Sequence, residues 1–200
     1  MTATLTEDQR DALQELCNVA MGQAGDSLAR LLNHFVELSI PTIKLHDVQS
    51  LPVGISPLFI DPPVIAGAQV FRIAAHDADQ VEGLAIVTVP TPALHALQNL
   101  MAVNDQRALL LKLTSVIAGD FLWGLGQQLD LSIAPDSPTW HGVIADTDSM
   151  LATLPRIYHS TLCVDLNYRL EQHNFQCGLI LLLPDQAFVY LQNRLQELLG

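Results

Sequence analysis

The chain has 200 residues, and 50% of them are hydrophobic, which is enough to build a substantial core in one domain. Its 21 acidic residues against 9 Lys and Arg give a net charge of −12. This balance excludes a nucleic-acid binder, because such proteins neutralise phosphates with basic residues. The apolar runs are only of strand length, and residues 1–10 are polar and acidic. We therefore expect a cytoplasmic protein without a membrane-spanning helix or a signal peptide.

Metal and nucleotide chemistry have no support in the sequence. The 7 histidines lack the spacing of a metal-binding motif, and no glycine-rich phosphate loop is present. We therefore expect no cofactor bound by this chain. The cysteines form no C-x-x-C pair, which predicts reduced thiols buried in the core at Cys17, Cys163 and Cys177.

The first predicted element is a helix over about residues 7–33, opened by a capping box of Thr6 and Gln9. At 100° per residue, its apolar side chains spread from about 140° to 260° around the axis from Asp11. They are Leu13, Leu16, Cys17, Ala20, Ala24, Leu28 and Leu31.

A polar strip lies opposite this apolar face. Glu15, Asn18, Gly22 and Gly25 fall within roughly 40° of Asp11. An ordinary solvated helix face is one interpretation, but the strip lacks the Lys or Arg four residues on that usually pairs with such carboxylates. Each glycine also costs the helix about 1 kcal/mol relative to Ala. A strip without side chains lets another backbone come close, so we treat it as a candidate site.

The strip belongs to a longer pattern: Asp11, Glu15, Asn18 and, after twenty-two intervening residues, Pro41. This pattern resembles the signature of the CheC/CheX/FliY family of chemotaxis phosphatases, which is Asp or Ser, three residues, Glu, two residues, Asn, twenty-two residues and Pro. All four positions match. The resemblance implies that the substrate is a phosphorylated CheY-type response regulator, with its phosphoaspartate beside a Mg²⁺ ion and a lysine.

The resemblance gives the strip residues roles that fit their chemistry. A neutral amide can accept a hydrogen bond from a water and donate one to a phosphoryl oxygen, so Asn18 is the residue we expect to orient the attacking water. Glu15 is expected to dock the lysine of the regulator and not to act as a base. For Asp11 two interpretations remain open, a bond to the partner surface or an interaction with the helix dipole. Gly22 and Gly25 complete the expected substrate-binding surface.

The elements that follow alternate between strands and helices. We expect a strand over 35–40 that ends at Pro41, a Pro- and Gly-rich loop over 51–67, and antiparallel hairpins further on. The predicted strands are 69–75, 83–89, 129–134, 140–144, 158–168 and 175–183, and the predicted later helices are 91–101, 104–129 and 185–199.

An internal repeat supports the resemblance, because CheC-type proteins consist of two related halves. Gly83 and Gly178 each open an apolar strand that is followed by a Pro break and a helix containing Leu-Gln-Asn. We expect one CheC-like domain over 1–200 with halves of about 1–102 and 103–200. The expected fold class is α+β, with two pseudo-symmetric halves that share an antiparallel sheet and two long packed helices.

The second half does not keep the signature. Pro138 lies twenty-two residues after Ser115, which places Ser115 at the Asn position, Lys112 at the Glu position and Ala108 at the Asp position. We therefore expect a degenerate second site and assign function to the first helix only.

The sequence thus predicts a phosphatase that hydrolyses the aspartyl-phosphate of a response regulator in chemotaxis or two-component signalling. The alternative is a non-catalytic module that binds the response regulator or CheD, a receptor deamidase that CheC-type proteins bind. The helix with Lys112 and Ser115 is the expected docking surface for CheD. The two-half layout suggests a monomer whose pseudo-dimer is internal.

Overall fold

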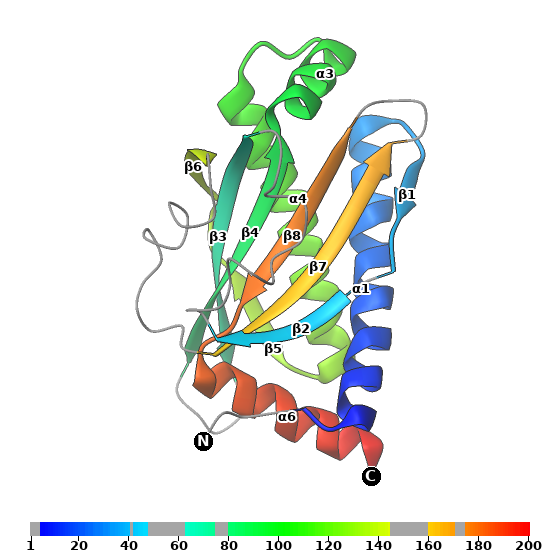
Figure 1. Ribbon diagram of the computed structural model, residues 1–200, viewed down its shortest axis with the longest axis vertical. Helices are drawn as coiled ribbons and strands as arrows, with labels where there is room; N and C mark the ends of the chain where they lie inside the picture. Colours follow the sequence, from blue (N-terminus) through cyan, green and yellow to red (C-terminus); the bar gives the residue numbers. More distant parts are fainter. Residues whose placement is uncertain (1–4, 41, 48–62, 75–79, 145–159, 171–174) are drawn as a thin grey trace.

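The computed structural model describes residues 5–40, 42–47, 63–74, 80–144, 160–170 and 175–200 (Figure 1). Its helices are α1 (Glu7–Leu32), α3 (Thr91–Met101), α4 (Gln106–Leu129) and α6 (Asp185–Leu199). Its strands are β1 (Val36–Leu38), β2 (Thr42–Asp47), β3 (Val64–Ala74), β4 (Val81–Pro90), β5 (Ser132–Pro135), β6 (Thr139–Ile144), β7 (Ser160–Leu170) and β8 (Gln176–Leu182).

The predicted helices agree with the observed ones to within two residues at each end, since their capping and turn signals are local. The predicted C-terminal boundary of the loop over 51–67 was wrong, because β3 already begins at Val64. Gly67 was read there as a loop residue, but a Cβ on it would lie 2.1 Å from Thr114 Oγ1, so it lets β3 pack closely on α4. Strand β2 was not predicted, and Pro41 lies outside the described residues.

The described strands pair antiparallel in the order β1-β7-β8-β4-β3-β5, with β2 also on β7 and β6 also on β3. The early strands β1 and β2 therefore pair with a late strand, and β5 and β6 pair with an early one. This exchange joins both ends of the chain into one curled sheet whose centre is the β4–β8 pair. The α+β class with a shared antiparallel sheet is confirmed.

The register of the sheet repeats along the chain. Thr42 of β2 lies opposite Asp165 of β7, and Thr139 of β6 lies opposite Ala68 of β3. Thr139 follows Thr42 by 97 residues, and Asp165 follows Ala68 by the same 97. The same offset of 97 residues relates positions on α1 to positions on α4, so the two helices occupy equivalent places in a pseudo-symmetric fold.

The two long helices cover one face of the sheet, and α3 and α6 lie near its opposite ends (Figure 1). The main core fills the space between these helices and the sheet, with contributions from Leu13, Phe121 and Leu181. A smaller apolar cluster, which includes Ile86 and Ile180, lies on the other face of the sheet. The helix pair is thus fixed on its inner side by the core, and its outer side is available for a site.

Helix α4 is long and apolar enough to cross a membrane, with a mean hydropathy of 1.5 over its most apolar window. In the fold, Leu113, Ile117 and Phe121 on this helix are all 0% exposed. The apolar composition of α4 is therefore explained by its position in the core.

Close contacts hold α4 against α1. A Cβ on Gly124 would lie 3.2 Å from the Cα of Ala20, so the absence of a side chain lets the two backbones approach. Gln128 Nε2 donates to the carbonyl oxygen of Leu16 at 2.9 Å. Position 124 thus lies beside 20 and position 128 beside 16, which shows that the helices run antiparallel.

Candidate functional site

The start of α1 is fixed by the predicted capping box. The Gln9 backbone N–H donates to Thr6 Oγ1 at 3.2 Å, and the Thr6 backbone N–H donates to Gln9 Oε1 at 3.1 Å. These bonds satisfy N–H groups that a helix start leaves without partners. The helix therefore begins at Glu7, and the strip residues that follow lie on a regular backbone.

Asp11, Glu15 and Asn18 are all exposed on α1, as the helical spacing predicted. None of the three forms a side-chain hydrogen bond or an ion pair with another residue in the described part of the chain. Further along the same helix Asp26 does form an ion pair, with Arg30. The carboxylates and the amide of the strip are therefore available to an outside ligand.

The two glycines of the strip differ in their surroundings. A Cβ on Gly22 would have no heavy atom within 4 Å, so this position is open. A Cβ on Gly25 would lie 2.7 Å from Leu38 Cδ2, and Gly25 is buried under that side chain of β1. The structure thus uses Gly25 to seat its own edge strand, whereas Gly22 leaves bare backbone beside Asn18.

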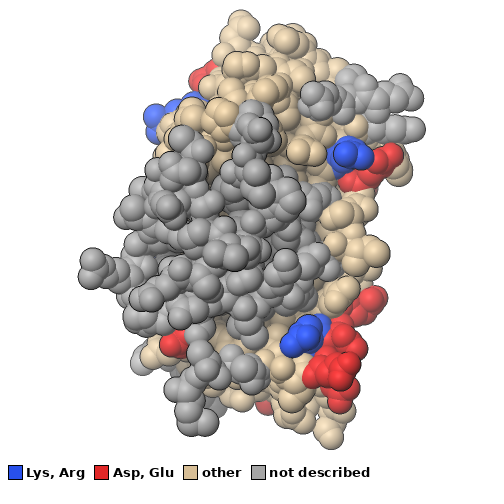
Figure 2. Space-filling model, in the orientation of Figure 1, with Lys and Arg blue, Asp and Glu red and all other residues tan. Residues whose placement is uncertain are grey.

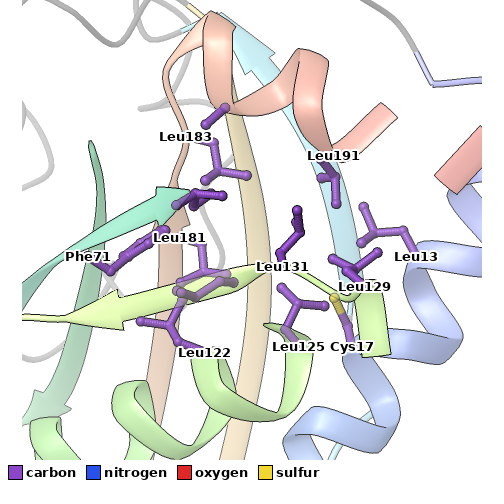
Figure 3. A pocket seen from close by; sticks show the side chains of 13 residues that line it. Leu13, Cys17, Phe71, Leu122, Leu125, Leu129, Leu131, Leu181, Leu183 and Leu191 are labelled. Carbon is purple, nitrogen blue, oxygen red and sulfur yellow. The ribbon is translucent and has the colours of Figure 1, made fainter. Parts of the chain in front are cut away.

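The opposite side of α1 faces an apolar interior. Leu13 and Cys17 point into a small cavity of about 20 Å³, which is also lined by Leu122, Leu181 and Leu191 (Figure 3). Burial raises the pKa of the Cys17 thiol to about 12, so it stays protonated and inert at neutral pH. Cys17 and Cys177 are both buried free thiols, as the cysteine spacing predicted. Cys163 belongs to a stretch of β7 whose side chains are not described.

Helix α4 presents the equivalent strip with other residues. Ala108, Lys112 and Ser115 are exposed, and a Cβ on Gly119 would have no heavy atom within 4 Å, as at Gly22. Lys112 forms no ion pair with any described residue. The geometry of the strip is therefore kept on α4, but the carboxylate and the amide are lost.

Potential metal ligands are dispersed in the part of the chain that the structure describes. Within the described ranges, no group of three or more His, Cys, Asp or Glu side chains is placed to hold a metal ion. On the face shown in Figure 2, the charged side chains lie along the edges of the molecule, with acidic and basic groups next to one another. Acidic side chains gather at the lower right of that face, beside one basic group (Figure 2).

Sequence reasoning missed one exposed aromatic residue on the helix face, Trp123 of α4, whose exposed fraction is 59%. Periodicity alone does not single it out, because an apolar residue in an apolar helix is expected to be buried. The signal that could have found it is the 97-residue offset, which pairs Trp123 with the exposed Asp26 of α1.

The fold defines a class: this is a CheC-like fold, an antiparallel sheet covered by two long packed helices. The structure of Thermotoga maritima FliY superposes with a TM-score of 0.72 at 14% sequence identity, over 98% of this chain and 99% of that chain. The FliM middle domain from H. pylori gives a TM-score of 0.60 at 8% identity, over 95% of this chain and 99% of that one.

A CheC-like superfamily protein from Shewanella sp. PV-4 gives a TM-score of 0.51 at 10% identity and covers 89% of this chain and 98% of that one. No protein-family model matches the sequence, and no curated protein reaches a significant match. At these identities the likeness establishes the fold alone. The activity must be argued from the residues on α1.

Proposed function

We propose that this chain is a phosphatase for the phosphoaspartate of a CheY-type response regulator. The observation that carries the proposal is the pair Glu15 and Asn18, exposed on one face of α1 and without partners in the described part of the chain. The similarity of the fold to FliY and to a CheC-like protein supports a role in chemotaxis or flagellar switching, and we expect a cytoplasmic location.

The helix offers a rigid support for such a pair. Leu13, Cys17 and Ala20 are each 0% exposed and hold α1 from the inner side along the length of the strip. Catalytic groups on packed helices are positioned more precisely than groups on loops. Because phosphoryl transfer depends on positioning and charge stabilisation, this rigidity favours catalysis by orientation.

In the proposed reaction a water attacks phosphorus in line with the aspartyl oxygen. A new O–P bond forms as the bond to the aspartyl oxygen breaks, which releases inorganic phosphate and a free carboxylate. Asn18 accepts a hydrogen bond from the water and donates one to a phosphoryl oxygen, without bringing negative charge to the site. A Mg²⁺ ion, which would be held by the response regulator and not by this chain, would neutralise charge on the phosphoryl group.

Glu15, one turn before Asn18, has a different role. A carboxylate beside a phosphoryl group repels it unless the carboxylate meets a cation, so Glu15 binds the active-site lysine of the response regulator. Asp11 and the open backbone at Gly22 extend the contact surface along the strip. Gly25 contributes indirectly, because it seats Leu38 at the end of the strip.

A non-catalytic binding module is the second candidate function. FliM from H. pylori has this fold and forms a complex with FliG, so the fold also serves protein assembly. In that case Glu15 and Asn18 only recognise the response regulator. The exposed Lys112 and Ser115 on α4 are then a docking surface for a further partner such as CheD. A pull-down of CheD with the wild type and with Lys112→Glu tests this docking surface. Equal recovery of CheD by the two proteins would contradict it.

The deciding experiment measures loss of phosphate from a purified, autophosphorylated receiver with Mg²⁺. The samples are receiver alone, and receiver with wild type, Asn18→Ala or Glu15→Ala. The proposal predicts acceleration by the wild type, loss of that acceleration in Asn18→Ala and weakened binding in Glu15→Ala. If the wild type binds the receiver and leaves its decay unchanged, the binding module is the correct function.

A further inference from the structure

Two large apolar side chains are exposed on the outer side of the helix pair. Trp123 of α4 is 59% exposed and Val19 of α1 is 43% exposed. Val19 directly follows Asn18 in the sequence. Tryptophan is enriched among the few residues that carry most of the energy of protein interfaces, so an exposed Trp near a site is informative.

The helix contacts place these two residues together. Gly124 contacts α1 at the Cα of Ala20, and Trp123 and Val19 each lie one residue before these contact points. Neighbouring residues differ by about 100° around a helix axis, so the side chains of Trp123 and Val19 point roughly perpendicular to the line that joins the two helix axes. Because both are exposed and the other direction is core, both point outward, within about one helical turn of the contact.

The backbone next to Asn18 is open, because Gly22 has no heavy atom within 4 Å of an added Cβ. Asn18 lies one residue before Val19, about 1.5 Å along the axis and about 100° further around α1 from the α4 contact at Ala20. Val19 therefore lies between Trp123 and the polar strip on the outer side of the helix pair, and a partner that covers this side can contact Trp123, Val19 and Asn18 together.

We propose that Trp123, with Val19, is the apolar docking contact for the receiver domain whose phosphoaspartate faces Asn18. The inference rests on the proposed function of that site. Glu15 and Asn18 are exposed polar groups, and exposed ion pairs contribute little to affinity because water and salt screen them. A buried Trp surrounded by contacts that exclude water supplies the missing binding energy.

This assignment gives α4 a role although its signature residues are lost. Trp123 touches neither the phosphoryl group nor the attacking water, so it is a positioning residue. It holds the partner in place over the residues of α1. The chemistry thus belongs to α1 and much of the affinity belongs to α4.

The first test is steady-state dephosphorylation of a phosphorylated receiver by wild type, Trp123→Ala, Trp123→Phe and Val143→Ala. Val143 of β6 is 62% exposed and serves as the matched control for loss of an exposed apolar side chain. We expect Trp123→Ala to raise KM about tenfold or more with little change in kcat. Trp123→Phe recovers part of this loss, and Val143→Ala leaves both constants unchanged.

The second test reports docking without activity. The chain has only 2 Trp residues, so the Trp140→Phe variant leaves Trp123 as the single fluorophore. Addition of a receiver that lacks Trp is expected to shift the emission to the blue as the indole leaves water. An unchanged KM in Trp123→Ala, with an active wild type, overturns the docking role and leaves the phosphatase intact.

The remaining outcomes separate the two proposals. If the wild type does not accelerate decay but the Trp140→Phe variant shows the blue shift, the phosphatase is overturned and the docking contact is supported. A wild type with neither acceleration nor shift overturns both. An accelerating wild type whose single-Trp form shows no shift at saturating receiver contradicts the contact at Trp123.

Discussion

Substitution of Gly22 by Ala separates the stability of α1 from its use as a site. A Cβ at this position has no heavy atom within 4 Å, so it causes no clash. Ala is more favourable than Gly in a helix interior by about 0.5–1 kcal/mol. We therefore expect Gly22→Ala to stabilise the protein by that amount, or by about 1–4 °C in Tm for a chain of this size.

The activity is expected to move the other way. If the receiver lies against the bare backbone beside Asn18, the added methyl group at Gly22 holds it off and the rate of dephosphorylation falls. Gly119→Ala is the matched control, because Gly119 is equally open but its open side points about 140° around α4 from the α1 contact at Gly124. It should gain the same stability and keep its activity.

A third variant tests the packing argument itself. In Gly124→Ala the new Cβ lies 2.1 Å from Gln23 Oε1, and the exposed Gln23 side chain can rotate away, but it also lies 3.2 Å from the Cα of Ala20, so the α1 backbone must shift by a few tenths of an ångström. We therefore expect Gly124→Ala to lack the gain in stability of Gly22→Ala. Thermal or urea unfolding measures all three variants, and the phosphate-release assay measures the first two. A Gly22→Ala protein that is more stable and fully active would refute the role of Gly22, and one that is less stable would refute its open environment.

Three further predictions concern the core, the buried thiol and the second helix. Leu13→Ala enlarges a cavity of about 20 Å³ and should lower the free energy of unfolding, measured in urea, by about 3–5 kcal/mol; a loss under about 1 kcal/mol contradicts the packing. The pKa of the Cys17 thiol is raised from 9.0 to about 12, so its contribution to stability is present below pH 9 and is lost as pH rises from 9 to 12. Between pH 9 and 12 the free energy of unfolding of Cys17→Ala should therefore fall less steeply than that of the wild type, by about 1.4 kcal/mol per pH unit. An unchanged slope would contradict the burial of the Cys17 thiol. Ala108→Asp, Lys112→Glu and Ser115→Asn together, in the Asn18→Ala background, should restore measurable dephosphorylation from α4 at saturating receiver, and no gain would show that the strip geometry alone is insufficient.

Helix α1 was predictable from the sequence because its determinants are local. The capping box of Thr6 and Gln9 fixes its start, and the apolar face between Leu13 and Leu28 fixes its orientation on the core. The exposure of Glu15 and Asn18 follows directly from that orientation. The candidate site could therefore be placed before the rest of the fold was known.

Features that depend on distant partners were not predictable in the same way. Strand β2 forms because Thr42 pairs with Asp165, far away in the sequence, and Gly67 lies in a strand because it packs against Thr114 of α4. Gly25 was predicted on the partner-facing strip, yet it is covered by Leu38 of β1. The exposure of Trp123 likewise depends on how α4 packs against α1, which no local pattern shows.

The central claim is that one residue on α1, and not its equivalent on α4, orients the hydrolytic water. The most direct test compares phosphate release from a phosphorylated receiver at saturating concentration with Asn18→Ala and with Ser115→Ala. We expect Asn18→Ala to return the rate to that of the receiver alone and Ser115→Ala to match the wild type. Equal rates in the two variants would contradict the assignment of catalysis to α1.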